Sequence, residues 1–152
     1  SVLPLPVGDF NANGSLDAGD LDLLASGMIA RDAKFDLDGD TDADIADRLK
    51  WVNDLKRTWM GDADLNGEFN SGDMVSVFTA GKYENGTTTT WSEGDWNGDK
   101  LFSSGDLVVA FQGGGYEQGP RAGVAAVPEP TSCVLGLFGL LGVISMARGR
   151  RT

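Results

Sequence analysis

The feature that most constrains this chain is a twelve-residue stretch, residues 62–73, in which oxygen-bearing side chains recur at alternate positions. Positions 1, 3, 5 and 12 of the stretch are Asp62, Asp64, Asn66 and Asp73. Gly67 follows at position 6, where a tight loop needs a residue that tolerates the left-handed backbone region. Such a loop directs several oxygens towards one point, so the stretch predicts a site for a hard cation.

The spacing is that of an EF-hand calcium loop. Calcium prefers six to eight oxygens in a flexible shell, and position 7 adds a backbone carbonyl. Position 8 is apolar, as Phe69 is here. The candidate ligands of this stretch, which is the third of four such loops and is called loop 3, are Asp62, Asp64, Asn66, Glu68 and Asp73.

Three further stretches repeat the pattern, so the chain is expected to bind up to four Ca²⁺ ions. The candidate ligands of loop 1 (residues 9–20) are Asp9, Asn11, Asn13, Ser15, Asp17 and Asp20. Those of loop 2 (residues 36–47) are Asp36, Asp38, Asp40, Asp42, Asp44 and Asp47. Those of loop 4 (residues 95–106) are Asp95, Asn97, Asp99, Leu101 and Asp106, with Leu101 acting through its carbonyl.

Position 6 divides the loops into two kinds. Loops 1 and 3 carry glycine there, whereas loops 2 and 4 carry Thr41 and Lys100. A left-handed backbone costs a non-glycine residue roughly 1–2 kcal/mol. Loops 2 and 4 have a glycine two residues earlier, Gly39 and Gly98, which leaves open whether the glycine is displaced or lost. If occupancy is unequal, we expect loops 1 and 3 to hold their ions longest.

The charge balance supports metal binding and excludes a nucleic-acid partner. The net charge is −11, with 23 acidic residues against 12 basic ones and no histidine. Phosphate binding requires a basic face, which this composition does not supply. Because most acids fall in the four loops, the metal-free chain should repel itself, and calcium should assist folding. Cys133 is the single cysteine, so no intrachain disulfide is possible.

A helix is expected after each loop. One should begin near Ala18, with Leu21, Leu24 and Met28 on its core-facing side. A second amphipathic helix should follow loop 2, with tryptophans flanking it. Its apolar stripe is Ile45, Leu49, Val52 and Leu55.

Loops 3 and 4 belong to an internal repeat with an offset of 33 residues, from Gly61 to Gly94. The similarity continues through the following helices to Tyr83–Gly86 and Tyr116–Gly119, which indicates a duplicated structural unit. Loops 1 and 2 form a more diverged pair. We expect each pair to join through position 8, with Leu16 near Ala43 and Phe69 near Phe102, and we expect Thr87–Thr90 to be a flexible spacer.

The last residues have a different character. Pro128, Glu129 and Pro130 precede an uncharged segment, residues 131–147, and then three arginines within residues 148–151. The segment is about 17 residues, or roughly 25 Å as a helix, which is the lower limit for crossing a bilayer. The segment is therefore a candidate transmembrane helix, and the arginines after it predict a cytoplasmic C-terminus.

The loops, with aspartate at position 12 and a helix directly after it, resemble type I dockerin repeats across residues 8–119. The resemblance implies a calcium-dependent module that folds on binding the ion and docks onto a cohesin-like partner. The family reads its partner at loop positions 10 and 11, often Ser-Thr. Here these positions are Ala18-Gly19, Ile45-Ala46, Ser71-Gly72 and Ser104-Gly105, which departs from that pattern.

The proline-glutamate-proline motif, apolar segment and arginine cluster resemble a PEP-CTERM sorting signal. This resemblance implies recognition by an exosortase in the bacterial membrane. The protein would be exported to the cell surface or the extracellular space after transient anchoring in the inner membrane through residues 131–147. The two features together are similar to secreted proteins of planctomycete-like bacteria.

We therefore expect an all-α fold of tandem EF-hand or dockerin-like loop–helix repeats in two pairs, followed by a C-terminal hydrophobic (transmembrane) helix. The expected parts are a linker at 1–7, pair 1 at 8–60, pair 2 at 61–119, a linker at 120–127 and a sorting tail at 128–152. The first residue is Ser1, so we also expect an N-terminal part that precedes this sequence.

The expected function is a non-catalytic calcium-binding module for docking or spacing. It could also be an accessory module of an extracellular polysaccharide-degrading enzyme whose catalytic part lies elsewhere. Catalysis by the module itself is disfavoured because its carboxylates are spaced for ions and no histidine supports them. The sequence is further compatible with a calcium sensor, an ordinary C-terminal anchor, lipidation at Cys133, and a sugar platform formed by Trp51, Trp59, Trp91 and Trp96.

Overall fold

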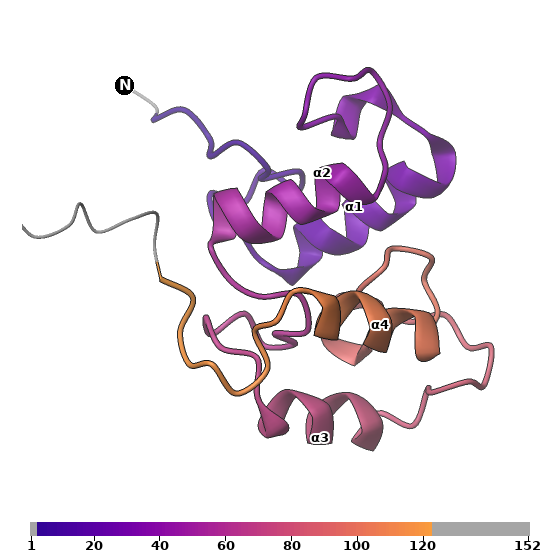
Figure 1. The fold of residues 1–152 in the computed structure, drawn as a ribbon. Helices are drawn as coiled ribbons and strands as arrows, with labels where there is room; N and C mark the ends of the chain where they lie inside the picture. The colour runs from indigo at the N-terminus through magenta and orange to yellow at the C-terminus, as the bar shows by residue number, and fades with distance from the viewer. Residues whose placement is uncertain (1–2, 123–152) are drawn as a thin grey trace, which may run out of the picture. The chain divides into compact units, whose positions relative to one another are not determined.

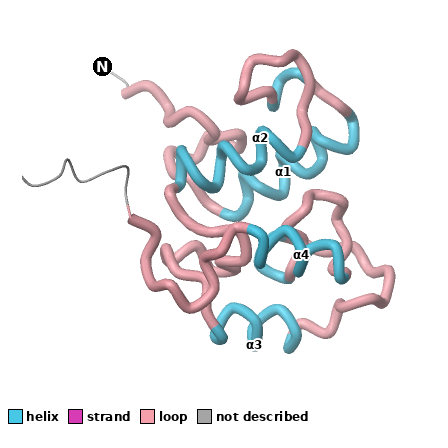
Figure 2. The backbone as a smooth tube through the Cα atoms, viewed as in Figure 1, coloured by secondary structure: helices cyan, strands magenta, loops and turns pink. Residues whose placement is uncertain are grey.

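The computed structural model describes residues 3–122, and this part of the chain contains four α-helices and no named β-strand (Figures 1 and 2). The helices are α1 (Ala18–Ala30), α2 (Ile45–Lys50), α3 (Ser71–Thr79) and α4 (Ser104–Gln112). Three short turns complete the order: the 3₁₀ turns η1 (Ala33–Phe35) and η3 (Trp91–Glu93), and the π-helical turn η2 (Trp51–Lys56), which directly continues α2. The predicted all-α, loop–helix architecture is confirmed for these residues.

Each α-helix begins at position 10 of its loop, because position 9 is the N-cap. The four capping residues are Asp17, Asp44, Asn70 and Ser103. In every case the position-12 aspartate completes a capping box by accepting a hydrogen bond from the N-cap backbone. The capping box satisfies backbone N–H groups that the first helical turn leaves unpaired. The loop spacing therefore fixes where the helices start.

The core is continuous through the described chain, and residues of both expected pairs contribute to it. Leu21 and Leu24 of α1 are fully buried, as the sequence predicts, and share one hydrophobic cluster with Phe69 and Phe102. Three of the four tryptophans, Trp51, Trp91 and Trp96, are also completely buried in this cluster.

The buried tryptophans do not form the sugar platform that the sequence left open as an alternative. Two of them direct their ring N–H groups at backbone carbonyls: Trp51 donates to Gly8 and Trp91 donates to Asp62. Trp59, which is half-buried, donates to the carbonyl of Gly119. These rings therefore fasten backbone segments inside the protein and are not displayed for a ligand.

The structure corrects the orientation of α2. Ile45 and Leu49 are 38% and 36% exposed, while the buried face presents Arg48, Trp51 and Val52. Trp51 thus lies within the helical segment instead of flanking it. Half of the expected apolar stripe is confirmed, because Val52 is fully buried and Leu55 packs against the core. Ile45 and Leu49 are displaced from it because the buried arginine finds partners that the periodicity of apolar residues does not reveal.

The pairing of loops 3 and 4 also differs from the prediction. Phe69 and Phe102, both at position 8, do not bridge each other; Phe69 bridges Tyr116 and Phe102 bridges Tyr83. Each loop therefore pairs with the segment that follows the helix of the other repeat. Leu16 and Ala43 join the same hydrophobic cluster, and no bridge links them among the described residues.

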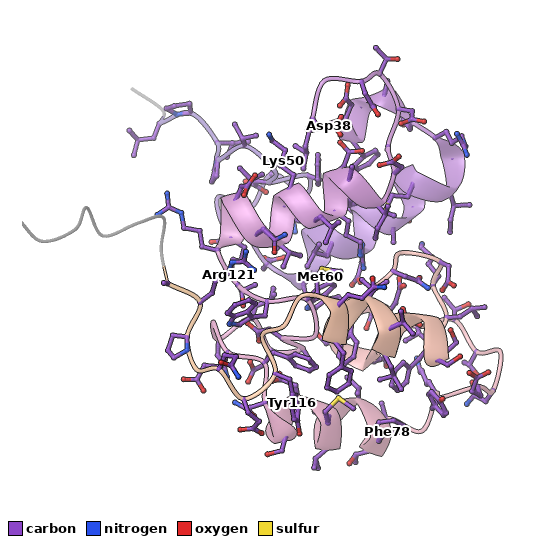
Figure 3. All side chains as sticks on the ribbon, in the orientation of Figure 1. Asp38, Lys50, Met60, Phe78, Tyr116 and Arg121 are labelled. Atoms are coloured by element: carbon purple, nitrogen blue, oxygen red, sulfur yellow. The ribbon has the colours of Figure 1, made fainter. Side chains whose placement is uncertain are left out.

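Trp96 lies between the two repeats. Its ring contacts Phe69 and Phe102 edge-on, with centroids 5.7 and 5.9 Å apart. Phe69 in turn packs against Tyr116, and Phe102 against Tyr83. Tyr116 is labelled beside α3 in Figure 3. The position-8 rings thus meet through Trp96 and not through a shared strand.

The expected spacer at residues 87–90 is an ordered part of the fold. Thr89 is only 2% exposed, and its N–H donates to the carbonyl of Lys100 over 2.8 Å. The Thr90 backbone N–H and hydroxyl both donate to Glu93. Polar composition suggested flexibility here, but Thr89 is held by loop 4 and Thr90 by η3.

Within residues 3–122, no helix has the length and apolar character needed to cross a membrane. The predicted transmembrane segment 131–147, the Pro128–Glu129–Pro130 motif and Cys133 lie outside the described residues.

Substitution at Trp96 tests this account of the core. We expect Trp96→Ala to lower the unfolding free energy by about 3–5 kcal/mol, because a fully buried aromatic ring is removed. Trp96→Phe should cost less, since the ring N–H of Trp96 has no hydrogen-bond partner to lose. Urea unfolding measures both values, with Val75→Ala, at a 67% exposed position, as the control. Equal losses for Trp96→Ala and Val75→Ala would contradict the assignment.

Candidate metal centres

The position-12 carboxylate of each loop is buried and aimed back into the loop by backbone N–H groups. In loop 3, Asp73 Oδ1 accepts from Ala63 N at 2.8 Å and Oδ2 from Asn70 N at 2.9 Å. The equivalent carboxylates, which make the same kind of contacts, are Asp20, Asp47 and Asp106. All four are at most 4% exposed. Each carboxylate therefore ties the loop's entry to its helix.

The position-1 carboxylate is held from the opposite side of the loop. Asp62 accepts from Asn66 N at 3.1 Å and from Gly67 N at 2.8 Å. The hydroxyl of Thr58 donates to the same carboxylate. Asp9 repeats the backbone pattern with Asn13 and Gly14.

Positions 3 and 5 form a chain of short turns along each loop. In loop 3, Asp64 accepts from Asn66 N at 3.1 Å, and Asn66 accepts from Glu68 N at 2.9 Å. The corresponding turns recur in the other loops at Asn11, Asn13, Asp38, Asp40, Asn97 and Asp99. Side-chain-to-backbone bonds of this kind fix the direction of each side chain.

The predicted ligands converge in loops 2, 3 and 4. Within each of the following groups, one carboxylate oxygen of each residue lies within 4.8 Å of the corresponding oxygens of the others: Asp62, Asp64 and Asp73; Asp95, Asp99 and Asp106; Asp36, Asp38 and Asp40; and Asp40, Asp42 and Asp44. In loop 2, Asp47 belongs to neither group, and Asp42 also pairs with Arg31 at 3.4 Å. Asp38, labelled in Figure 3, is an exposed member in the segment before α2.

Loop 1 is built differently, because amides replace two carboxylates. Asn11 and Asn13 stand at positions 3 and 5, and their side-chain N–H groups donate to Asp17 at 3.3 and 2.6 Å. Asp17 is consequently occupied by these amides and by the helix cap. The predicted position-7 ligands of loops 3 and 4, Glu68 and Leu101, add no side-chain oxygen to the converging carboxylates. The Glu68 carboxylate accepts a hydrogen bond from the side chain of Asn70, and Leu101 offers only its backbone carbonyl.

Every loop contains two left-handed residues, at positions 4 and 6, and one of the two is glycine. The position-4 residues are Ala12, Gly39, Leu65 and Gly98, with φ of 60°, 91°, 56° and 90°. The position-6 residues are Gly14, Thr41, Gly67 and Lys100, with φ of 88°, 84°, 101° and 65°. The glycine of loops 2 and 4 is thus displaced and not lost. Thr41 is the most strained, since β-branched side chains tolerate this region worst.

Burial makes the ionised carboxylates of loops 3 and 4 unfavourable without a cation. It raises the pKa of Asp62 and of Asp95 to about 6, and it also raises the pKa of Asp73 and of Asp106. Asp95 Oδ2 is buried and has no hydrogen-bond partner. Buried carboxylates normally find a counter-charge or coordinate a metal.

These observations fit Ca²⁺. The converging donors are carboxylate, amide and backbone oxygens, which hard cations prefer, and the described chain gathers no histidine or cysteine among them. The residues that would hold the ions are those at positions 1, 3, 5 and 12, with the position-7 carbonyl. A bound ion would supply positive charge to the buried carboxylate of Asp62 and would add to the charge that Arg48 already provides, 3.8 Å from Asp95.

Sequence reasoning missed two side chains that support these loops. Thr58 reaches Asp62 from outside loop 3, and Arg48 of α2 lies 3.8 Å from the carboxylate of Asp95 in loop 4. Arg48 is the only position-13 residue that is not apolar, because the other loops carry Leu21, Met74 and Leu107 there. The arginine at position 13 of loop 2 was the one feature of the sequence that pointed to this contact.

Comparison with known proteins gives one match. Residues 126–151 match the PEP-CTERM protein-sorting motif. This confirms the predicted sorting signal, and such a motif indicates a secreted, surface-sorted protein that an exosortase processes. No curated protein and no solved structure matches the chain.

The strain at position 6 can be tested by exchanging residues. We expect Thr41→Gly to raise the unfolding free energy by about 1 kcal/mol, and Gly67→Ala to lower it by about 1 kcal/mol, because both act on a left-handed position. No atom lies within 4 Å of a methyl group at Gly67, so only the backbone should respond. Denaturant unfolding is the measurement. Thr41→Ala keeps a side chain at positive φ and should recover less than half of the gain; an equal gain would refute the argument.

The raised pKa values predict how the metal-free protein responds to pH. Asp62 and Asp95 bind a proton more tightly when folded, with a pKa of about 6, than at their ordinary value of 3.8. Their contribution to stability is therefore complete below about pH 4 and is lost as the pH rises through about 6. Asp62→Asn with Asp95→Asn should remove this loss, since the amides cannot ionise. Thermal unfolding with a chelator, from about pH 4 to about pH 7.5, compares the two proteins; parallel curves would contradict the prediction.

Proposed function

We propose that residues 8–119 form a calcium-binding, dockerin-like, non-catalytic module that serves docking or spacing in a secreted bacterial protein. The observation that carries the proposal is the buried Asp95 carboxylate. One of its oxygens has no hydrogen-bond partner, and it converges with Asp99 and Asp106. Arg48 lies 3.8 Å from this oxygen and compensates part of its charge, but it leaves the oxygen without a hydrogen bond; a divalent cation would coordinate it directly.

The repetition of the arrangement supports a structural role for the ions. In all four loops the position-12 aspartate connects loop and helix, so a bound ion would stabilise the helix start together with the loop. Metal affinity then becomes folding free energy. A constitutive structural ion also suits an exported protein better than a sensor does, because calcium is usually abundant outside cells.

The docking role is supported by an exposed surface that both repeats of pair 2 share. Ser71 and Gly72, at positions 10 and 11 of loop 3, are exposed, as are Ser104 and Gly105 of loop 4. On the same helices, the exposed apolar side chains are Val75, Phe78, Val108 and Phe111. A cohesin-like or other surface protein is the proposed partner class.

The sorting tail defines where the module would act. In this proposal the protein is held transiently in the inner membrane through residues 131–147 with its C-terminus in the cytoplasm. Exosortase processing would then release the acidic module to the cell surface or the extracellular space.

Calcium titration of the 152-residue chain tests the metal-binding function. Calorimetry should give binding heat for up to four ions, and circular dichroism should show helix gained with calcium and lost with a chelator. Asp62→Ala with Asp73→Ala should remove one ion, because these carboxylates close loop 3 from both ends.

Asp54→Ala is the matched control, since Asp54 is an exposed acid outside the loops. It should leave the stoichiometry unchanged. Absence of calcium heat together with an unchanged spectrum would refute the proposal. An unchanged stoichiometry in the loop 3 double variant would instead refute the ligand assignment.

A further inference from the structure

Arg48 is a fully buried cation that the calcium loops do not require for ligation. It directly follows Asp47, the position-12 residue of loop 2, and lies in the first turns of α2. Burying a guanidinium is unfavourable unless its donors are satisfied and its charge is compensated. Its partners therefore indicate what its position accomplishes.

Those partners belong to loop 4 and to α1. Arg48 Nε donates to the carbonyl of Trp96 at 2.9 Å, and Nη2 donates to the carbonyl of Asp95 at 2.6 Å. Nη1 donates to the carbonyl of Leu21 at 2.8 Å. The guanidinium also lies 5.2 Å from the ring centre of Trp91, within cation–π range. One side chain thus joins three segments that are distant in sequence.

Two of these contacts fix the entry of loop 4. Asp95 and Trp96 are its positions 1 and 2, and Arg48 holds the carbonyls of both. The same guanidinium is 3.8 Å from Asp95 Oδ2, the oxygen without a hydrogen-bond partner. Gly98, at position 4, packs close to Arg48 as well, since a methyl group built there would be 3.5 Å from its side chain. Displacement of Arg48 would therefore move the first ligand of loop 4.

We propose that Arg48 is a positioning residue that couples loops 2 and 4, so that calcium binding in one raises the calcium affinity of the other. This inference rests on the proposed calcium-binding function. An ion in loop 2 orders the entry of that loop, whose Leu37 and Asp38 N–H groups are bound to Asp47 in the first turn of α2, and α2 then holds the Arg48 side chain against the entry of loop 4. By linkage, an ion in loop 4 favours the same arrangement and strengthens loop 2 equally.

The internal repeats show that this connection is specific to one pair of loops. The residues equivalent to Arg48 are apolar, and apolar side chains cannot hold backbone carbonyls. Arg121 provides a contrast, because it also joins distant segments. Its side chain donates to Asn53 and to the carbonyl of Thr58, and it contacts neither loop 2 nor loop 4 through any of these bonds.

Two glycine amides report on the coupled loops separately. Gly39 N donates to Asp36 in loop 2, and Gly98 N donates to Asp95 in loop 4. Their NMR shifts can be followed during calcium titration of the full 152-residue chain. Loop 2 is disabled by Asp36→Ala with Asp38→Ala, which are not fully buried. We expect the calcium midpoint at Gly98 to rise at least about fivefold, the lower end of typical couplings.

Disabling loop 1 by Asp9→Ala with Asn11→Ala is the control for a general loss of stability. It should change the midpoint at Gly98 less than about twofold, because loop 1 reaches Arg48 through one bond only, to the carbonyl of Leu21, and supplies neither of the bonds that Arg48 makes to the entry of loop 4. If the loop 2 variant leaves the Gly98 midpoint unchanged, or if the loop 1 variant raises it equally, the inference is overturned. This comparison keeps Arg48 intact and does not depend on how an Arg48 variant folds.

Variants of Arg48 test whether this side chain carries the coupling between loops 2 and 4. In Arg48→Met the midpoint at Gly98 should no longer respond to the loop 2 substitutions, whereas in Arg121→Met the response should persist. Arg48→Lys keeps the charge but not the three-carbonyl geometry, and should also lose most of the response. A full response in Arg48→Lys or Arg48→Met would overturn the inference. If calcium shifts neither Gly39 nor Gly98 in the parent protein, the proposed function itself fails.

Discussion

The structure depends on one recurring interaction, the carboxylate of the position-12 aspartate. It accepts hydrogen bonds from the entry of its loop and from the N-cap of the following helix, as Asp73 does with Ala63 and Asn70. The same side chain thus closes the loop, starts the helix and directs an oxygen at the candidate ion site. Because helices this short are marginal by themselves, a loop that stabilises the first turn has a large effect on the whole fold.

Duplication of this unit explains the arrangement of loops 3 and 4. Glu84 and Glu117 occupy equivalent places after α3 and α4, and each carboxylate accepts from the first helical N–H of the other repeat, Ser104 and Ser71. Acidic groups at helix N-termini are favourable because of the helix dipole. Each repeat therefore caps its neighbour, and the bridges from Phe69 and Phe102 follow the same reciprocal pattern. Each helix start is capped by its own loop and receives one additional hydrogen bond from the other repeat.

Pair 1 is joined to this unit by Arg48, which holds the backbone carbonyl of Asp95 at the start of loop 4. Within pair 2, Trp91 holds the carbonyl of Asp62 at the start of loop 3 in the same way. A carbonyl that is bound in this way positions the carboxylate of the same residue. The buried polar contacts of the core and the acidic loops are consequently parts of one structure, and the core helps to set the geometry of the candidate metal centres.

The sequence by itself determined the loops, the starts of the helices and the sorting motif, because each follows from local spacing. Asp62 and Asp73, for example, must share a loop whatever surrounds them. Tertiary structure decided the remainder. The pairing of Phe69 with Tyr116, the burial of Trp51 and Trp91, and the rotation of α2 around Arg48 all depend on partners remote in sequence. Periodicity counts apolar residues, and it cannot register that an arginine is buried when three distant carbonyls satisfy it.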